Sequence, residues 1–588
     1  MSTNSSDKST GKTTIDLIES PPTTVWGILR RLGPGLVIAG SIVGSGELIA
    51  TTAAGAQAGF WLLWLIIVGC VIKVFVQVEF GRYSITTGQG TMEGLEQVPG
   101  PRIPGRGNWL VWYWVLMFCA SLAQLGGIVG GVGQALSISV PITADGRAYN
   151  EQMDAETRYT VARAELKLSS EKAEAGIPPN DEKVAELNEL ADELGPVIVA
   201  MRLGEIDKKL QEMTTEQAAK DQAFALAREI VNQRAVEYPG RPDLIFASRG
   251  DYEEGEDGTE VAADKMLATM GLRKSIDDKL WATLITVVTA IILVMGRYSL
   301  IQMFSTTMVA AFTVITIVNL IALQRYGEWA VTMQDIMNGL SFGLPPNNEK
   351  ALSTALKAFG IIGVGASELI AYPYWCLERG YARFTGPTDS SEAWANRARG
   401  WLRVMRWDAW CSMFVYTFAT VAFYLLGAAI LGRIHLEPKG TEMIRTLSLM
   451  YAPVFGEFTQ VLFLFGAFAV LYSTFFVANA GQARMCADAM QVTGLATKKP
   501  ETYRRNVQFL SGLFPFICLT VYWVITSPKE LVMFSGLMQA MMLPMLSFAA
   551  LFFRYKRSDI RILPGRLWDV FLLISSIGML IAGSWAGY

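Results

Sequence analysis

Long apolar segments constrain this chain more than any other feature, because eleven stretches of about 20 residues suit membrane-spanning helices. A helix of that length crosses a hydrocarbon core about 30 Å thick. The chain is 51% hydrophobic, and its apolar residues are concentrated in these stretches. The pattern predicts an all-α membrane protein that crosses the bilayer many times. The expected spans are residues 33–54, 60–81, 109–137, 279–297, 299–322, 353–376, 408–431, 456–478, 506–526, 530–553 and 566–587.

Lys and Arg indicate on which side of the membrane each loop lies, because cytoplasmic loops carry an excess of both. If the N-terminus is cytoplasmic, most of these residues fall in inner loops, including the basic stretches 397–406 and 554–566. We therefore expect a cytoplasmic N-terminus and an outer C-terminus in a bacterial inner membrane or plasma membrane. No secretory leader is evident, and the polar residues 1–24 are predicted to form a disordered cytoplasmic tail.

Composition argues against several classes of function. The single histidine, His435, lies in a predicted outer loop, so neither a His-based zinc site nor a histidine proton relay is expected. None of the six cysteines lies in an outer loop, which argues against an extracellular disulfide framework. The chain has no phosphate-binding loop, nucleophile elbow or metallohydrolase spacing. We therefore expect no enzyme activity, no cofactor and no nucleic-acid partner. The expected partners are the lipid bilayer and a small inorganic ion or solute.

A polar insertion at residues 143–278 separates the third span from the fourth. Heptad spacing within 184–194 predicts a helix that Gly195 and Pro196 end. Thr214, with Gln three residues later, has the spacing of a capping box and predicts a helix reaching about residue 238. We expect an extracytoplasmic helical hairpin or small bundle, a possible surface for a protein partner. The predicted order is tail 1–24, helices 25–142, insertion 143–278 and helices 279–588.

The acidic stretch DYEEGEDGTE at 251–260 falls within this insertion. It lacks the ligand spacing of an EF-hand loop and its final Glu. A solvated acidic loop is therefore favoured over a cation site.

One short phrase occurs twice in the apolar segments. VGSGELIA at 43–50 returns as VGASELIA at 364–371, with only two letters changed. Glycine costs a helix about 1 kcal/mol relative to alanine, so the glycines beside each glutamate indicate a place where the helix opens. The first and sixth spans run in opposite directions under the expected topology. This is the signature of an inverted five-plus-five repeat, whose broken helices form the binding site.

Glu47 and Glu368 are the central residues of the two phrases. A charged residue at the centre of a membrane helix costs about 3 kcal/mol on insertion scales, which favours a functional role over mere bracing of neighbouring helices. Two nearby carboxylates would bind a hard divalent cation, or share one proton when empty. Ser45 and Ser367 lie at matching depth and either add hydroxyl ligands or pack between helices. The candidate substrate-binding residues are Gly44, Ser45, Gly46, Glu47, Val364, Gly365, Ser367, Glu368 and Gln539, with Glu47 and Glu368 as metal ligands.

Lys73 complicates this hypothesis, because it lies near the middle of the second span. A buried lysine is expected to pair with a carboxylate, and the candidates are Glu47, Glu368 and Glu79. The alternative is a lysine that extends toward the inner surface near Arg82. A Lys–Glu pair would remove one anionic ligand and would favour a protonation-linked organic or anionic solute.

Four segments resemble a known family. GPGLVIAGSIVGSGELIATTAAGAQAGF (33–60) and LLWLIIVGCVIKVFVQVEFGRYSITTGQ (62–89) resemble the first two helices of the natural resistance-associated macrophage protein (Nramp) family of divalent metal transporters. GIIGVGASELIAYPYW (360–375) resembles its sixth helix and SGLMQAMMLP (535–544) its tenth. The resemblance does not cover residues 143–278. It implies a LeuT-type fold with an eleventh helix, and transport by alternating access.

This chain departs from the family at the metal site. Gly44–Glu47 replaces the Asp-Pro-Gly-Asn of the family's first helix, and Ser367, Glu368 and Leu369 replace the Met-Pro-His of its sixth. The soft methionine ligand is therefore absent there, and two glutamates stand instead. We expect a secondary transporter for a hard divalent cation such as Mg²⁺ or Mn²⁺. The alternatives are a transporter of a different small solute on the same scaffold and a non-transporting sensor.

Overall fold

The long helices lie close to the predicted spans. The computed structural model describes residues 18–35, 44–174, 178–212, 222–250, 257–296, 299–346 and 349–587. Within this part, contacts divide the chain into two compact units, which are described separately. The first, the membrane unit, comprises Met1–Ala135, Trp281–Gly432 and Leu436–Tyr588. The second, the helical unit, comprises Leu136–Leu280 and Arg433–His435, and it overlaps the predicted insertion.

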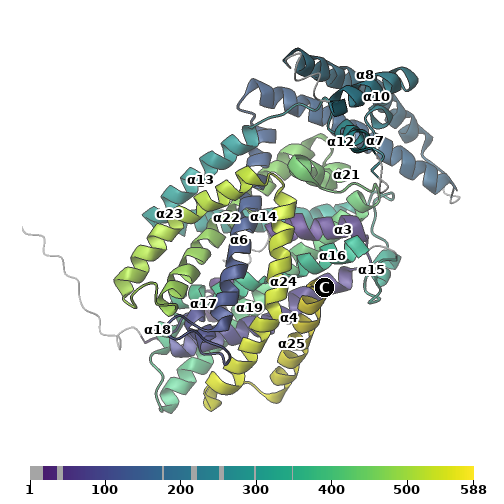
Figure 1. Cartoon of the computed structure of the whole chain (residues 1–588). Coiled ribbons are helices and arrows are strands. Elements are labelled where there is room, and N and C mark those ends of the chain that lie inside the picture. The colour runs from purple at the N-terminus through teal and green to yellow at the C-terminus, as the bar shows by residue number, and fades with distance from the viewer. Residues whose placement is uncertain are drawn as a thin grey trace, which may run out of the picture. The chain divides into compact units, whose positions relative to one another are not determined.

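Eight helices in the described residues are long and apolar enough to cross a membrane. In the membrane unit, α4 packs against α17, α19 and α25, and α24 packs along α25 (Figure 1). In α14 (Ser299–Leu323) the apolar stretch is Thr307–Leu323, which is shorter than the length required of the eight. The eight are α4 (Leu63–Thr87), α6 (Trp109–Ser139), α13 (Asp277–Met295), α19 (Glu392–Leu426, continued by Gly427–Gly432), α22 (Thr459–Val492), α23 (Pro500–Val524), α24 (Pro528–Phe552) and α25 (Arg566–Ala586).

The sixth span is interrupted, as the repeated phrase predicts. α16 (Glu349–Phe359) ends before six non-helical residues, Gly360–Gly365, and α17 (Ala366–Arg379) continues the span. In the first span, residues 36–43 lie outside the described part of the chain. Gly44 is not helical (φ −128°, ψ −103°), and the π-helix η2 (Ser45–Thr51) begins directly after it and leads into α3 (Thr52–Ala58).

The helix that carries the first phrase packs beside the break in the sixth span, because η2 contacts α16, which ends just before that break. Every regular element in the described residues is helical. The predicted all-α membrane fold with a helical insertion is thus confirmed. Opened backbone at membrane depth is stable only inside protein or beside a cavity, and here both opened segments are buried inside the protein.

Part of the predicted disordered tail is ordered, which corrects the assignment of residues 1–24. Residues 1–17 lie outside the described part, but Glu19 is tied to the membrane unit. Its backbone N–H donates to the Phe384 carbonyl (3.1 Å), and its carbonyl accepts from the Trp401 indole (2.9 Å). Its carboxylate pairs with Arg31. The polar composition predicts that water solvates these backbone groups, whereas in the structure they bond to the protein.

The helical unit contains α7 (Ala144–Glu174), α8 (Asp181–Glu212), α10 (Gln222–Glu237), α11 (Pro242–Ile245) and α12 (Gly258–Leu267). The prediction that Gly195 and Pro196 end a helix is wrong, because α8 runs through both. A proline inside a helix costs about 3 kcal/mol. Ala191 and Ile198 on either side of it are buried against Tyr159 of α7, and this packing outweighs the local preference. The predicted capping box at Thr214 lies outside the described residues, and so does most of the acidic stretch 251–260.

A carboxylate in this unit provides a test of its stability. Burial raises the pKa of Asp243, but hydrogen bonds from Arg241 and Tyr159 outweigh it, and the pKa lies below the ordinary value. The folded state thus gains stability that is present above the ordinary Asp pKa of about 3.9. It is lost as the pH falls through the lowered value. Hydrogen bonds to charged groups contribute about 1.5–3 kcal/mol, and less here because Asp243 is partly exposed.

We therefore expect Asp243→Asn to accelerate hydrogen–deuterium exchange in α11 at neutral pH, after correction for intrinsic exchange rates. The difference between the two proteins should close in acid, once the wild-type carboxylate is protonated. Asp207→Asn serves as a control, because Asp207 belongs to the same unit and its side chain is largely exposed. Equal exchange of wild type and Asp243→Asn at pH 7 would contradict the assignment.

Candidate functional site

The break in the sixth span leaves backbone groups that need partners inside the membrane unit. Gly363 adopts a left-handed conformation (φ +59°), so its N–H turns away from the carbonyl of Phe359 that a continuous helix would offer it. It donates instead to Glu47 Oε1 (3.2 Å). The carbonyls of Phe359 and Ile362 accept from Lys73 Nζ, at 2.8 Å for Ile362. A carboxyl group and an ammonium group from two other spans therefore bind the opened backbone.

Glu47 is fully buried in η2. Its Oε1 also accepts from the Thr420 hydroxyl of α19 (3.1 Å), while its Oε2 has no hydrogen-bond partner in the protein. Gly46 allows η2 to approach the break, because a Cβ there would lie 3.0 Å from the Ile361 carbonyl. Gly44 likewise packs against Thr474 of α22. The glycines of the first phrase are therefore required for close packing as well as for bending.

Lys73 is fully buried, and the predicted Lys–Glu pair is wrong. Its ammonium donates to backbone carbonyls and lies 4.8 Å from the centre of the Phe359 ring. Glu79 pairs instead with Arg82 (3.0 Å) and accepts from the Trp568 indole (2.7 Å). Extension toward the inner surface is excluded as well, because none of the Lys73 side chain reaches solvent.

Glu368 lies in the first turn of α17 and is partly buried. Its Oε2 lies over Gly365, so a side chain at that position would collide with the carboxylate. Glu368 lines a cavity of about 20 Å³ between α17 and α22. A space of about 10–15 Å³ already holds one water molecule, so this cavity suits a single ion or water. The lining residues are Ser367, Glu368, Ala371, Trp375, Val477, Ala478, Gly481, Gln482 and Met485.

Two residues of α22 bring chemistry to this cavity that the sequence analysis did not identify. Gln482 is buried, and its Oε1 has no hydrogen-bond partner in the protein. Met485 contributes a thioether, a soft donor. Glu47 is not among the described residues that line the cavity. Its convergence with Glu368 on one binding site stays a prediction. The two glutamates meet the break two residues apart, at Gly363 and Gly365.

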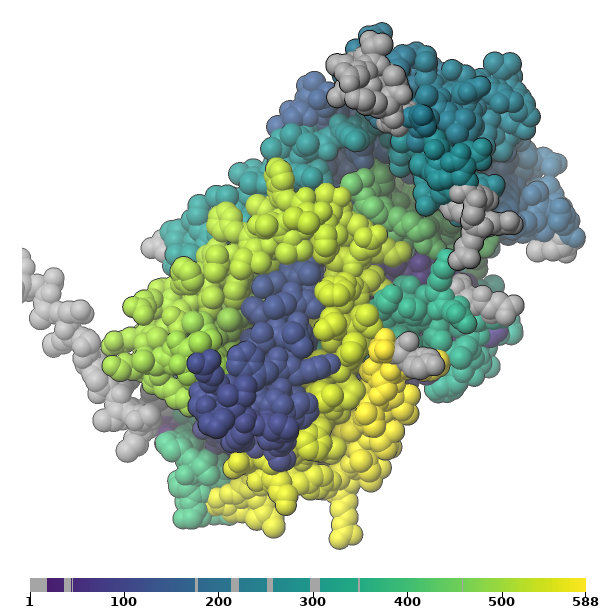
Figure 2. Space-filling model, viewed as in Figure 1, coloured from purple at the N-terminus to yellow at the C-terminus, as the bar shows by residue number. Residues whose placement is uncertain are grey.

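A polar network connects the start of α17 to two other helices. Ser367 N–H donates to Gln539 Oε1 of α24 (3.0 Å), and the Ser367 hydroxyl bonds the Ser121 hydroxyl of α6 (2.7 Å). Gln539 Nε2 in turn donates to Gln124 Oε1 of α6 (2.7 Å). Figure 2 shows α6 bordered by α24 on the viewed face. The predicted site residues Ser367 and Gln539 are therefore adjacent, and Val364 and Gly365 are buried in the break beside them.

The sequence offered little signal for the partners Thr420, Ser121 and Gln124. Each is one uncharged polar residue in a long apolar helix, a pattern common in ordinary helix packing. The side chain of Ser45 lies outside the described part of the structure. No group of three or more His, Cys, Asp or Glu side chains that would hold a metal ion occurs in the described residues.

A larger pocket lies near the ends of α17 and α22. Trp375 lines the small cavity, and the Arg484 guanidinium lies 4.9 Å from the centre of its ring. Arg484 also pairs with Glu378. Both charged residues line the larger pocket, of about 690 Å³, together with Lys498 just before α23 and Arg504 in its first turns. A residue that lines the cavity therefore contacts a residue that lines the wide, charged pocket.

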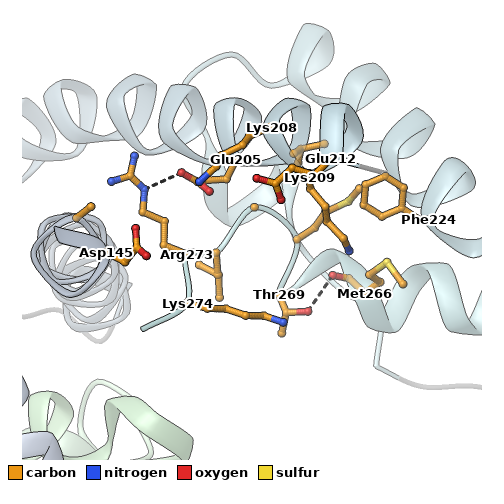
Figure 3. A pocket seen from close by; sticks show the side chains of 15 residues that line it. Asp145, Glu205, Lys208, Lys209, Glu212, Phe224, Met266, Thr269, Arg273 and Lys274 are labelled. Carbon is orange, nitrogen blue, oxygen red and sulfur yellow. Dashed lines mark hydrogen bonds and ion pairs between the residues drawn. The ribbon is translucent and has the colours of Figure 1, made fainter. Parts of the chain in front are cut away.

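The helical unit has a pocket of its own, of about 630 Å³ (Figure 3). Glu205 and Glu212 line it together with Lys208, Lys209 and Lys274, and Arg273 lies 3.0 Å from Glu205. The two signs of charge are mixed, so the lining selects no particular class of ligand.

Comparisons with known proteins agree with the geometry. The family model described as "Natural resistance-associated macrophage protein-like" matches residues 261–584, more than half of the chain. A divalent metal cation transporter MntH of Caldanaerobacter subterraneus is 26% identical over 20% of this chain and 26% of its own length. Metal transporter Nramp2 of Populus trichocarpa is 28% identical over 22% of this chain and 23% of its own. The chain thus matches about a quarter of the length of these relatives.

Among solved structures, a variant of the Eremococcus coleocola manganese transporter is similar at 12% identity. The match covers 96% of this chain and 88% of that one, with a TM-score of 0.49.

Proposed function

This chain belongs to the natural resistance-associated macrophage protein family, and on that premise we propose that it carries a hard divalent cation, Mg²⁺ or Mn²⁺, across the membrane by alternating access. One observation carries the proposal. The Glu368 carboxylate and the unpartnered Gln482 Oε1 line one ion-sized cavity at a broken membrane helix. Hard cations prefer such oxygen donors, and interrupted helices are where transporters of this architecture bind substrate. The relatives named as divalent metal cation transporters support the same substrate class.

The size of the cavity argues against the alternative of an organic solute. About 20 Å³ between α17 and α22 has room for an ion but not for an organic molecule. Met485 is the single soft donor in the lining, against oxygen donors from Ser367, Glu368 and Gln482. The oxygen donors favour Mg²⁺ or Mn²⁺ over Cd²⁺.

We further propose that the end of α17 near Arg379 faces the cytoplasm. Arg379 donates to the Leu32 carbonyl (3.4 Å), and the Tyr381 hydroxyl donates to the Arg31 carbonyl (2.8 Å). The start of the chain's membrane unit and the basic loop after α17 therefore lie on one side. The excess of Lys and Arg in these loops favours the cytoplasmic side.

The test is uptake into proteoliposomes that contain the purified protein, with Mg²⁺, Mn²⁺, Ca²⁺ and Cd²⁺ supplied separately. We expect saturable uptake of Mg²⁺ or Mn²⁺ and weaker uptake of Cd²⁺. Calorimetric titration with the same ions measures binding without transport. Absence of both uptake and binding heat for every divalent ion at millimolar concentration would reject the proposal.

The insertion provides a separate prediction, because we propose that residues 143–278 are an extracytoplasmic domain that substrate binding does not require. The two ends of the insertion meet, since the Ile142 N–H donates to the Asp277 carboxylate (2.6 Å). A short Gly/Ser linker can therefore replace residues 143–276. We expect the shortened protein to bind and take up Mn²⁺ like the full chain. A shortened protein that is monodisperse and binds no Mn²⁺ would contradict this.

A further inference from the structure

The interruption of the sixth span leaves partial negative charge on carbonyls at the end of α16. The last carbonyls of a helix carry partial negative charge, and those of Phe359 and Ile362 have no helical partner after the chain turns at Gly363. In transporters with inverted repeats, such half-helix ends and unwound carbonyls coordinate the coupling cation. The position is therefore one where a small cation is expected to bind.

In this chain the position is already filled by a side chain. Lys73 Nζ donates to both carbonyls and lies over the Phe359 ring, and the whole residue is inaccessible to solvent. Its direct contacts are the two carbonyls and the aromatic face, whereas Glu47 and Glu368 attract it only through longer-range electrostatics.

A carboxyl group occupies the other side of the break. Glu47 accepts from the Gly363 N–H, which the same turn frees from the helix. The break is therefore stabilised by an ammonium at its carbonyls and a carboxyl oxygen at its amide. The two side chains come from different spans, Lys73 from α4 and Glu47 from η2.

We propose that Lys73 is a resident cation: its ammonium occupies a cation site formed by the Phe359 and Ile362 carbonyls, so the protein needs no free monovalent ion at that position. The role is independent of which substrate the protein carries. A free ion binds and leaves, whereas a tethered ammonium is always present at the break. Removing the side chain while leaving the backbone intact should uncover a site for a small monovalent cation.

The experiment is chemical rescue of the purified full-length protein, read as the melting temperature Tm. Lys73→Ala removes the ammonium and leaves a void, and methylammonium supplies the missing terminal carbon and nitrogen. Methylammonium, ammonium, Na⁺ and K⁺ are each titrated against choline at constant ionic strength. We expect Lys73→Ala to lower Tm by several degrees, and at least one of these ions to restore much of the loss in a saturable way.

Lys73→Met and Lys357→Ala are the matched controls. Methionine fills the space without charge, so Lys73→Met should lose Tm and gain nothing from any of the ions. Lys357 lies on α16, the helix that ends at Phe359, and its side chain is only partly buried, so its removal should leave Tm and the ion response unchanged. Wild type should show no ion response.

Three outcomes would overturn the proposal. One is a Lys73→Ala protein whose Tm responds to none of the ions. Another is a Lys73→Met protein with the Tm of wild type. The third is an equal response of wild type and Lys73→Ala. Because Tm is read without any divalent metal, failure here leaves the proposed metal transport untouched, and failure of metal uptake leaves this inference untouched.

Discussion

Glu368→Gln is expected to reduce uptake of Mg²⁺ or Mn²⁺ by at least about 100-fold, since even groups that only orient metal ligands contribute about 10–100-fold. Glu368 is the one residue with an ionisable side chain among those that line the ion-sized cavity, and glutamine keeps its shape without its ionisable group. Calorimetric titration of the purified variant should show a matching loss of binding heat. No new preference for Cd²⁺ should appear, because no soft donor is added.

Glu47→Gln is expected to have a smaller effect on the same measurements. Glutamine retains an oxygen that can accept from the Gly363 N–H and the Thr420 hydroxyl, so the break keeps these two bonds. The lost charge weakens the attraction for a divalent ion nearby. Glu530→Gln, at an exposed position in the first turn of α24, is the control for removing a carboxylate. Wild-type uptake by Glu368→Gln would remove the basis of the proposed site.

Gly363→Ala is the substitution with the second large expected effect. Gly363 has φ +59°, and an added Cβ would lie 3.0 Å from the Cα of Cys70, a backbone atom that cannot move aside. A left-handed conformation costs a residue with a side chain about 1–2 kcal/mol, and the contact adds to that cost. The turn should therefore shift, which separates Gly363 from Glu47 and the carbonyls from Lys73. We expect Tm to fall and uptake to be lost.

Gly88→Ala separates the two contributions to this effect. Gly88 is left-handed (φ +72°, ψ 7°), but an added Cβ there meets nothing within 4 Å. It should therefore show the conformational cost alone, with uptake retained. If Gly363→Ala and Gly88→Ala lower Tm equally and both transport Mn²⁺, the tight packing of the break is not needed for function.

Sequence patterns located the elements of the site more reliably than the contacts among them. The glycines around Glu47 and Glu368 predicted where the spans open, because helix propensity is a local property of the chain. The partner of Lys73 was predicted wrongly. A buried lysine is generally expected to pair with a carboxylate. In this chain Lys73 instead bonds to carbonyls that the break in the sixth span leaves without helical partners.

The sequence by itself determined the approximate position and order of the long membrane helices and the two positions where a glutamate lies beside glycines. These features depend on transfer free energies and backbone preferences that add up along contiguous residues. Only the tertiary structure decided that Lys73 holds carbonyls, that Gln482 and Met485 share a cavity with Glu368, and that α8 continues through Pro196. Each of these contacts depends on which helices lie side by side. An uncharged polar residue in an apolar helix does not indicate which helix packs against it.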